Sequence, residues 1–163
     1  MAQITLKGNN IHTIGEIPVA GEIAPDFTVV SQDLSEQTLA DSHGQRKILN
    51  IFPSIDTGVC AQSVRRFNEL ASEKGLKVWN ISMDLPFALS RFCSAEGIKN
   101  VQSFSAFRSG FPRDYGLEIV DGPLAGLCAR AVIILDENHK VLYSELVPEI
   151  GTEPDYEAAL GAL

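Results

Sequence analysis

The chain opens on alternating apolar and polar residues. Residues 3–6 (Gln-Ile-Thr-Leu) and 11–14 (Ile-His-Thr-Ile) alternate on either side of Gly8-Asn-Asn10, which predicts an N-terminal β-hairpin. The β-rich run 27–30 (Phe-Thr-Val-Val) predicts a further strand. The polar stretch 31–47 carries turn residues, and we expect it to be mostly loop.

The clearest helical pattern lies in the centre of the chain. Residues 48–52 form a short apolar run of the buried-strand type, which Pro53 ends. Beyond it a small set of residues recurs at the spacing of one buried helical stripe: Cys60, Val64, Phe67 and Ala71. Because Gly75 is a typical helix stop, this spacing predicts a helix over about 58–74.

The same alternation continues along the chain. Residues 76–83 predict a second strand, and Pro86 stands at the favoured first position of a second helix, which carries Leu89, Phe92 and Cys93. Strand, helix, strand and helix in this order imply a parallel pair of strands joined by a right-handed crossover.

The remainder of the chain predicts a mixed sheet. Residues 101–107 are a candidate strand, and the Gly- and Pro-punctuated region 111–126 has room for one helical turn. The β-rich runs 129–135 and 140–146 flank a four-residue turn, so we expect an antiparallel hairpin there. A last helix from Pro154 to Leu160 completes an α/β architecture, with a central mixed sheet flanked by helices.

Composition narrows the class of protein. The 163 residues, 45% of them hydrophobic, fit a single domain over 1–163. The net charge of −8 disfavours nucleic acid as a partner, because phosphate-binding proteins present basic patches. Apolar runs such as 131–135 are far too short to span a membrane, and residues 1–7 lack the pattern of a secretory signal, so we expect a cytoplasmic protein. In that reducing compartment, three cysteines are expected to be reactive or buried thiols.

Cys60 is the first candidate for chemistry. It falls in the first turn of the predicted helix, where free backbone N–H groups and the helix dipole stabilise negative charge and so favour a thiolate. Thr57 is a candidate N-cap whose hydroxyl can point into the first turn, and Gly58 leaves room beside the backbone, so a small polar pocket is expected around the sulfur. The alternative is a buried cysteine that only packs, since Cys60 lies on the apolar stripe.

A thiolate at this position needs a cation from elsewhere, because the nearby carboxylate of Asp56 opposes it. Arg130 is the best candidate, since it interrupts the apolar run 128–134, where an unpaired guanidinium would be costly to bury. An exposed arginine on an edge strand, or a structural salt bridge, is the alternative interpretation.

These residues resemble a known family. The run Pro53-Ser-Ile-Asp-Thr57-Gly-Val-Cys60 matches the Pro-x-x-x-Thr-x-x-Cys signature of the peroxiredoxins and is most similar to the bacterial thiol peroxidases. Further similar stretches follow in order along almost the whole chain: Asn50-Ile-Phe-Pro-Ser-Ile-Asp, Ser90-Arg-Phe-Cys93, Ala129-Arg-Ala and Thr152-Glu-Pro-Asp-Tyr-Glu-Ala-Ala-Leu160. The resemblance implies a thioredoxin-like fold with an N-terminal hairpin extension. It also implies an atypical two-cysteine peroxidase that is a homodimer, uses no prosthetic group and is recharged by thioredoxin.

The resemblance also implies roles for five residues. Cys60 would attack hydrogen peroxide or an alkyl hydroperoxide and become a sulfenic acid, and Cys93 would condense with it to an intramolecular disulfide that thioredoxin reduces. Thr57 would hydrogen-bond the sulfur and the substrate oxygens, Arg130 would stabilise the thiolate and the leaving oxygen, and Pro53 would shield the sulfur from water. An apolar rim beside the pocket would favour alkyl hydroperoxides.

The expected geometry separates the two thiols. Both helices are expected to begin at one edge of the sheet, but Cys93 lies seven residues beyond Pro86, about 10 Å further along a helix. A disulfide needs Cα atoms within about 7 Å of each other. We therefore expect local unwinding around Cys60, Cys93 or both when the disulfide forms.

The other candidate residues carry less chemistry. Cys128 is expected to be a buried packing thiol, and His12, His43 and His139 lack metal-ligand spacing, so no zinc site is expected. The chain has no Cys-x-x-Cys of a dithiol oxidoreductase and no phosphate-loop or dinucleotide fingerprint.

Two alternative functions are a cysteine hydrolase or acyl-transfer enzyme, which needs a histidine near Cys60, and a non-catalytic thioredoxin-fold binding module. The aromatic residues between 104 and 115 are candidates for either core or dimer interface: Phe104, Phe107, Phe111 and Tyr115.

Overall fold

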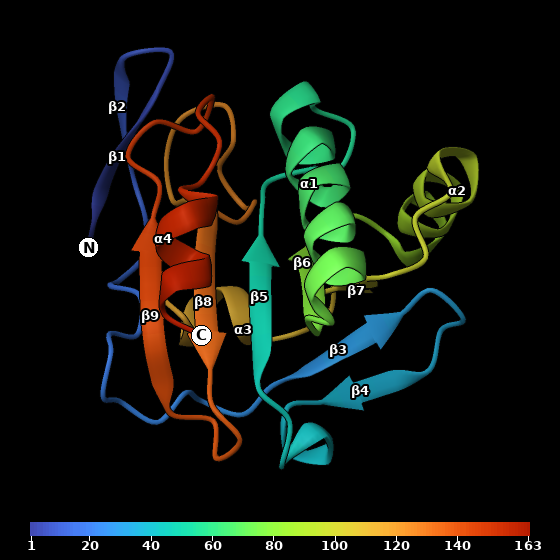
Figure 1. Cartoon of the computed structure of the whole chain (residues 1–163). Coiled ribbons are helices and arrows are strands. Elements are labelled where there is room, and N and C mark those ends of the chain that lie inside the picture. Colours follow the sequence, from blue (N-terminus) through green and yellow to red (C-terminus); the bar gives the residue numbers. More distant parts are fainter.

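A seven-stranded sheet forms the centre of the molecule (Figure 1), in a computed structural model that describes residues 1–163. The strands of this sheet lie in the order β4-β3-β7-β6-β5-β8-β9. Their bounds are β3 Thr28–Ser31, β4 Glu36–Thr38, β5 Lys47–Ile51, β6 Val78–Ser82, β7 Gln102–Ser105, β8 Ala131–Leu135 and β9 Val141–Leu146. A separate hairpin consists of β1 (Gln3–Leu6) and β2 (Asn9–His12), and it confirms the predicted N-terminal extension.

The sheet is mixed, as predicted. β5, β6 and β7 run parallel, whereas β8 pairs antiparallel with β5 and β9 antiparallel with β8. On the other side, β3 pairs antiparallel with β7 and with β4. Because β5 and β6 are parallel and each is followed by a helix, both helices begin at the same edge of the sheet.

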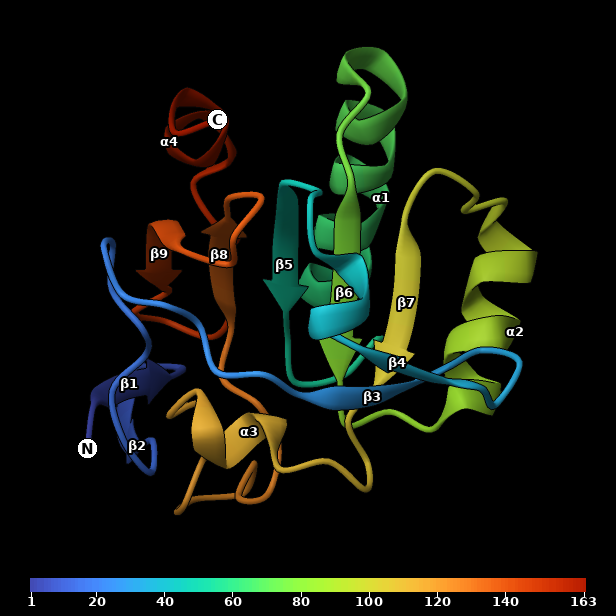
Figure 2. The ribbon, with the colours of Figure 1, turned by 90° about the horizontal axis from the view of Figure 1, so that it is seen from below.

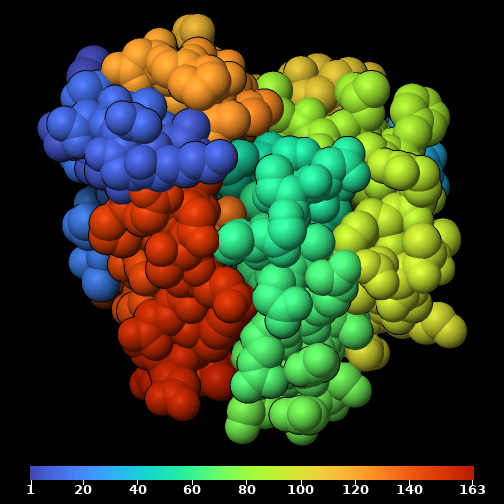
Figure 3. All heavy atoms as spheres, turned by 90° about the horizontal axis from the view of Figure 1, so that it is seen from above, coloured from blue at the N-terminus to red at the C-terminus, as the bar shows by residue number.

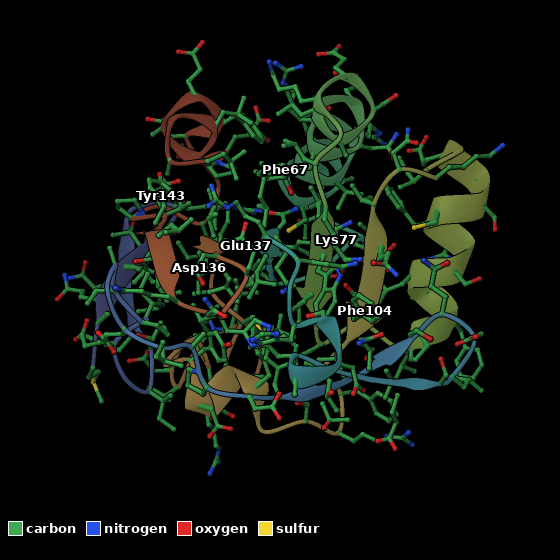
Figure 4. All side chains as sticks on the ribbon, turned by 60° about the horizontal axis from the view of Figure 1, so that its bottom comes forward. Phe67, Lys77, Phe104, Asp136, Glu137 and Tyr143 are labelled. Atoms are coloured by element: carbon green, nitrogen blue, oxygen red, sulfur yellow. The ribbon has the colours of Figure 1, made fainter.

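Helices cover the sheet unevenly. α1 (Gly58–Lys74) and α4 (Tyr156–Gly161) lie on one face, α2 (Pro86–Glu96) lies beside β7, and α3 (Phe111–Asp114) lies on the other face (Figure 2). A short 3₁₀ helix, η1 (Ala40–Ser42), precedes β5. Two apolar clusters result, one on each face: Phe67 belongs to the cluster under α1 and α4, and Phe104 to the cluster on the opposite side (Figure 4).

The ends of the helices follow from local chemistry. α1 has the bounds that the apolar stripe predicts, with Thr57 in extended conformation as its N-cap and Gly75 in the left-handed region at φ 66° as its C-cap. Pro86 occupies the first turn of α2, and Gly97 ends that helix in the same left-handed conformation, at φ 65°. Both helices are therefore bounded by residues that could be recognised beforehand.

The structure corrects two details of the N-terminal part. The stretch 31–47 contains β4, which pairs with β3, and η1, where mostly loop was expected. The polar residues of β4 gave no apolar alternation because this strand lies at the edge of the sheet. The hairpin turn also lies earlier than expected, at Lys7 and Gly8, which both have positive φ as a tight two-residue turn requires.

The aromatic residues of the central region are mainly core. Phe104, Phe111 and Tyr115 are buried, whereas Phe107 is partly exposed. Phe27 packs edge-on against Phe111 and Tyr115, which fixes the short helix α3 beneath the sheet. None of the helices is both long and apolar enough to cross a membrane.

Candidate active site

Cys60 is the third residue of α1, and its side chain has no exposed surface. It shares the buried stripe with Val64 and Phe67, as its spacing predicted. The stripe packs on β5 because the loop 52–57 carries the chain directly from the end of this strand into the helix. The sulfur is therefore held at the carboxyl edge of the sheet, beside the start of a helix.

Arg130 reaches this sulfur from the other side. It lies directly before β8, and its Nη2 is 3.3 Å from Cys60 Sγ. The carbonyl of Ile150 accepts hydrogen bonds from both Nε (3.0 Å) and Nη2 (2.9 Å) of the same guanidinium. The remaining nitrogen, Nη1, is buried without a hydrogen-bond partner. The geometry thus aims a fixed positive charge at Cys60 and leaves one donor free for a further acceptor.

The two alternative readings of Arg130 are wrong for this structure. The residue is only 1% exposed and lies at the start of an inner strand, so it is not a surface arginine on an edge. It forms no ion pair with a carboxylate. Because no carboxylate neutralises it, the positive charge of Arg130 remains available to Cys60. The buried surroundings screen this charge little, so its attraction to a thiolate is strong.

The loop before α1 is held by a carboxylate that the sequence did not single out. Asp84, after β6, accepts hydrogen bonds from Ser54 Oγ (2.9 Å), from the backbone N–H of Ile55 (2.7 Å) and from Ser82 Oγ (2.6 Å). Thr57 donates its hydroxyl to the carbonyl of Ser54 (3.1 Å) rather than pointing into the first helical turn, which corrects the expected side-chain cap. These bonds keep the backbone around Cys60 in one conformation.

Asp56 does not oppose the thiolate in the way its position suggested. Its carboxylate is exposed and pairs with Arg91 of α2 across 3.2 Å. Solvent and the partner guanidinium both screen this negative charge from Cys60. The same ion pair connects the loop before Cys60 with the helix that carries Cys93.

A cavity of about 310 Å³ opens beside this loop. Pro53, Thr57 and Arg130 all line it, so the structure brings three of the predicted site residues to one cavity, whereas Cys60 lies beneath the lining residues. The pocket was expected to be polar, but much of its wall is apolar, formed by Leu6, Val59, Leu124, Leu127 and Ile150. Several segments meet here: the blue hairpin, the start of α1 and the red C-terminal region lie side by side on the face shown in Figure 3.

Glu149 holds the N-terminal hairpin against this cavity. Its Oε1 accepts hydrogen bonds from the backbone N–H of Gly8 (2.9 Å) and from Thr5 Oγ1 (3.1 Å), and Oε2 accepts one from the N–H of Gly151 (2.7 Å). These hydrogen bonds, led by that from Gly151, lower the pKa of the Glu149 carboxyl below its ordinary value. The docked hairpin contributes Leu6 and Lys7 to the cavity wall.

Cys93 lies in a different environment. It is 7% exposed on α2, and its sulfur contacts Ser103 Oγ of β7 at 3.6 Å and the amide Nε2 of Gln32 at 3.7 Å. Burial raises the pKa of this thiol, and the two hydrogen bonds only partly oppose that effect. Cys93 is therefore surrounded by neutral polar groups, with no cation at its sulfur.

The two thiols contact different partners and are not bonded to each other. Cys60 contacts Arg130 beside β8, and Cys93 contacts Ser103 on β7, with β6 and β5 between those strands. These two outer strands are about 14 Å apart, since three strand spacings separate them. All three cysteines are free thiols.

The remaining candidates lie away from the cavity. Cys128 is fully buried in the cluster on the opposite face from Cys60, as predicted, and burial raises its pKa to about 12. His12 pairs with Asp121, while His43 and His139 pack edge to face against each other. None of the three histidines lines the cavity at Arg130, so the histidine base of the cysteine hydrolase alternative is not provided there.

Sequence reasoning missed three contributors to the site: Asp84, Glu149 and the carbonyl of Ile150. Asp84 carried a usable signal, since it follows β6 at the carboxyl edge, where parallel strands gather functional side chains. The carbonyl of Ile150 and the carboxylate of Glu149 carried none, because an irregular loop positions them.

A buried thiol at a helix start, facing a guanidinium on a mixed sheet, defines a protein suited to cysteine redox chemistry. Comparison with known proteins agrees with this class. The family model described as Redoxin matches residues 19–160. A thiol peroxidase of Mycobacterium tuberculosis (strain ATCC 25618 / H37Rv) is 55% identical over 163 residues, covering 100% of this chain and 99% of the relative. A thiol peroxidase of Corynebacterium glutamicum is 54% identical over 164 residues, with the same coverage.

Solved structures show the same fold. A peroxiredoxin-like protein from Aquifex aeolicus matches with a TM-score of 0.92 and 40% identity, covering 99% of this chain and 95% of that one. A thiol peroxidase from Chromobacterium violaceum matches with a TM-score of 0.91 over 98% and 93% of the two chains, at 24% identity. The chain belongs to the redoxin family and, within it, to the thiol peroxidases of the peroxiredoxin group. It is therefore an enzyme with the predicted thioredoxin-like fold.

Proposed function

We propose that Cys60 reduces hydroperoxides directly. Its thiolate attacks the terminal oxygen of the hydroperoxide, so that an S–O bond forms while the O–O bond breaks. The alkoxide or hydroxide that leaves takes up the proton that the thiol released, giving an alcohol or water. Cys60 becomes a sulfenic acid, oxidised by two electrons, as the peroxide is reduced by two.

The observation that carries this proposal is the guanidinium of Arg130. One of its nitrogens lies 3.3 Å from Cys60 Sγ, while Nη1 is free to donate and the residue also lines the cavity. Positive charge at this point stabilises the attacking thiolate, and a free donor stabilises charge that develops on the leaving oxygen. The two hydrogen bonds to Ile150 hold the guanidinium in place before the reaction, so little reorganisation is needed.

Pro53 and Thr57 complete the proposed site. Both line the cavity next to Arg130, and the Thr57 hydroxyl has an acceptor within its own loop at Ser54. Pro53 shields the sulfur from water, and Thr57 turns its hydroxyl to the peroxide oxygens when substrate binds. The sulfur lies beneath the lining residues, so the first turn of α1 opens slightly to admit the peroxide.

The apolar walls indicate the substrate class. Leu6, Leu124 and Leu127 border the cavity near Arg130, so the alkyl group of an organic hydroperoxide gains contact there that hydrogen peroxide lacks. We therefore assign alkyl hydroperoxides as substrates alongside hydrogen peroxide.

Cys93 is the proposed resolving residue. Its thiolate attacks the sulfenic sulfur of Cys60, the S–O bond breaks, and a disulfide forms as water leaves. Both thiols are buried and contact different partners, Arg130 and Ser103, so disulfide formation requires local unwinding at one or both cysteines. A thioredoxin dithiol then reduces the disulfide by exchange and is itself oxidised, so the cycle needs no prosthetic group. We propose a homodimer as the working assembly, which sedimentation analysis of the reduced protein tests.

The test compares peroxide consumption with thioredoxin by the wild type, Cys60→Ser and Cys93→Ser. We expect Cys60→Ser to be inactive, and Cys93→Ser to reduce one equivalent of peroxide and then stop without recycling. Mass spectrometry under excess hydroperoxide should find oxidation at Cys60 of the wild type. An unmodified Cys60, with another cysteine oxidised in its place, would contradict the proposal.

A further inference from the structure

A line of buried polar side chains crosses the sheet between the two thiols. Asn50 of β5, Asn80 of β6 and Ser103 of β7 are nearest neighbours in the strand register, and all are buried. Asn50 Nδ2 donates to Asn80 Oδ1 at 3.0 Å and to Ser63 Oγ of α1 at 3.3 Å. Buried amides in the middle of a sheet are costly unless they are paired, so their alignment across three strands calls for a reason.

The far end of this line lies under Cys93. Asn80 Nδ2 donates to Ser103 Oγ at 3.2 Å, and Ser103 Oγ is the atom in contact with Cys93 Sγ at 3.6 Å. Gln32 contacts the same sulfur from the β3–β4 side. The part of the sheet that Cys93 covers is therefore polar, and we call Asn80 and Ser103 together the polar floor.

The floor beneath α1 is mainly apolar, apart from the contact of Ser63 with Asn50. Ile48 and Val78 are neighbours in the register, two residues before Asn50 and Asn80 on the same face of their strands, and both belong to the apolar cluster under α1. Phe52, at the other end of β5, belongs to it as well. α1 contributes five buried residues to this cluster, whereas α2 contributes only Leu89, with Phe92 packed against it. Release of α1 therefore exposes more apolar surface to water than release of α2.

Water has a route to the polar floor. An open cavity of about 260 Å³ lies between the end of β3 and β7, and Gln32, Gln102 and Ser103 are among its lining residues. Ser103 therefore borders both this cavity and Cys93. When α2 moves away, water can replace the thiol as the partner of Ser103 and satisfy the amide of Asn80.

The reaction requires this movement if the function proposed above is right. Cys93 must leave Ser103 and come within disulfide distance of Cys60. We propose that Asn80 and Ser103 are positioning residues for this step, because the polar floor lowers the free energy needed to release α2 from the sheet. The Cys93 thiol then reaches the Cys60 sulfenic acid before a second peroxide does. The floor acts on disulfide formation and leaves the attack on peroxide untouched.

The variant Asn80→Leu/Ser103→Ala tests the proposal, because it makes the floor apolar and removes both partners of the Asn80–Ser103 bond together. The reduced protein is mixed with one equivalent of peroxide, and Cys60 sulfenic acid and the Cys60–Cys93 disulfide are quantified over time by trapping and mass spectrometry. We expect sulfenic acid to form at the wild-type rate. The disulfide should form more slowly than in the wild type, by up to about tenfold. With excess peroxide, Cys60 should be over-oxidised more readily.

Ser105→Ala is the matched control, because Ser105 is a buried serine on the same strand and face whose hydroxyl accepts from the N–H of Phe107 and contacts no cysteine. It should leave both rates unchanged. Disulfide formation at the wild-type rate or faster in the floor variant would overturn the proposal. If the double variant does not fold, Ser103→Ala alone should shift the disulfide rate in the same direction.

Hydrogen exchange of the reduced proteins separates this inference from the proposed function. The backbone amides of α2 should exchange more slowly in Asn80→Leu/Ser103→Ala than in the wild type, while those of α1 keep their rates. This measurement needs no peroxide chemistry. Unchanged exchange in α2 would refute the role of the polar floor, even if the enzyme reduces peroxide. A wild-type Cys60 that does not react with peroxide would refute the proposed function and leave the exchange result unaffected.

Discussion

Cys60 and Cys93 are both buried thiols on helices that follow parallel strands, yet their surroundings differ in charge. Cys60 faces the Arg130 guanidinium, which no carboxylate neutralises, whereas Cys93 contacts only the neutral groups of Ser103 and Gln32. Burial alone favours a protonated thiol, and the raised pKa of Cys93 reflects this.

The difference shows how one fold separates two tasks. A thiol that must act as a nucleophile in place needs fixed charge beside it, and Arg130 is held for this by the carbonyl of Ile150. A thiol that must move gains nothing from a strong partner, because every bond made in the folded state has to be broken first. The weak contacts of Cys93 suit the second case.

Removing the charge at Cys60 should have the largest effect. Arg130→Met is expected to lower the second-order rate of Cys60 oxidation by about 10²- to 10³-fold, because the thiolate and the leaving oxygen lose their donor. Stopped-flow measurement with one equivalent of peroxide gives this rate. Arg113→Met, at a largely exposed arginine, is the control and should react normally. A rate within twofold of the wild type for Arg130→Met would remove the proposed distinction between the two thiols.

The cavity belongs to the Cys60 side only, so its walls should affect only the first step. Leu127→Gln is expected to lower kcat/KM for a bulky alkyl hydroperoxide about tenfold, because the alkyl group loses apolar contact, and to change that for hydrogen peroxide little. Steady-state assays with both peroxides give the ratio. An equal loss for both substrates would show that Leu127 supports the fold of the site rather than alkyl binding.

The environment of Cys93 predicts a pH dependence of smaller size. Its pKa is raised above the ordinary value of 9.0 in the folded protein, so between that value and the raised one the unfolded chain has lost the proton and the folded protein keeps it. The unfolded state then binds fewer protons, and stability falls as pH rises through this window.

Urea unfolding of Cys60→Ser from pH 8 to pH 10.5, compared with Cys60→Ser/Cys93→Ser, isolates the contribution of Cys93. The difference in free energy of unfolding between the two proteins should change with pH in the stated direction. A difference that is flat across the range would mean that the Cys93 thiol ionises equally in both states.

Cys128 provides the reference with no expected effect on chemistry. Cys128→Ala should leave peroxide reduction and recycling unchanged and cost about 1 kcal/mol of stability, since the thiol only packs in the opposite cluster. Activity assays and urea unfolding measure the two quantities. Loss of recycling in this variant would mean that Cys128, and not Cys93, is the resolving residue.

Much of the fold could be predicted because its signals are local. The apolar stripe and Gly75 set the bounds of α1, and the turn 136–139 between two β-rich runs placed the hairpin of β8 and β9. The edge strand β4 escaped prediction, since a strand with one free edge and exposed faces needs no apolar alternation. Sequence patterns therefore predict the structure of residues whose surroundings consist mainly of their neighbours in the chain.

For the candidate site, the sequence by itself determined which residue types stand where: a cysteine in the first turn of a helix, a proline and a threonine before it, and an arginine at the start of a β-rich run. Only the tertiary structure decided that Arg130 meets Cys60 and binds the carbonyl of Ile150, that Asp84 holds the loop, and that Cys93 lies over the polar floor. The physical reason is the range of the forces involved. A hydrogen-bonding or charged side chain could pair with many different groups. The packing of segments that are distant in sequence decides which of these groups it meets.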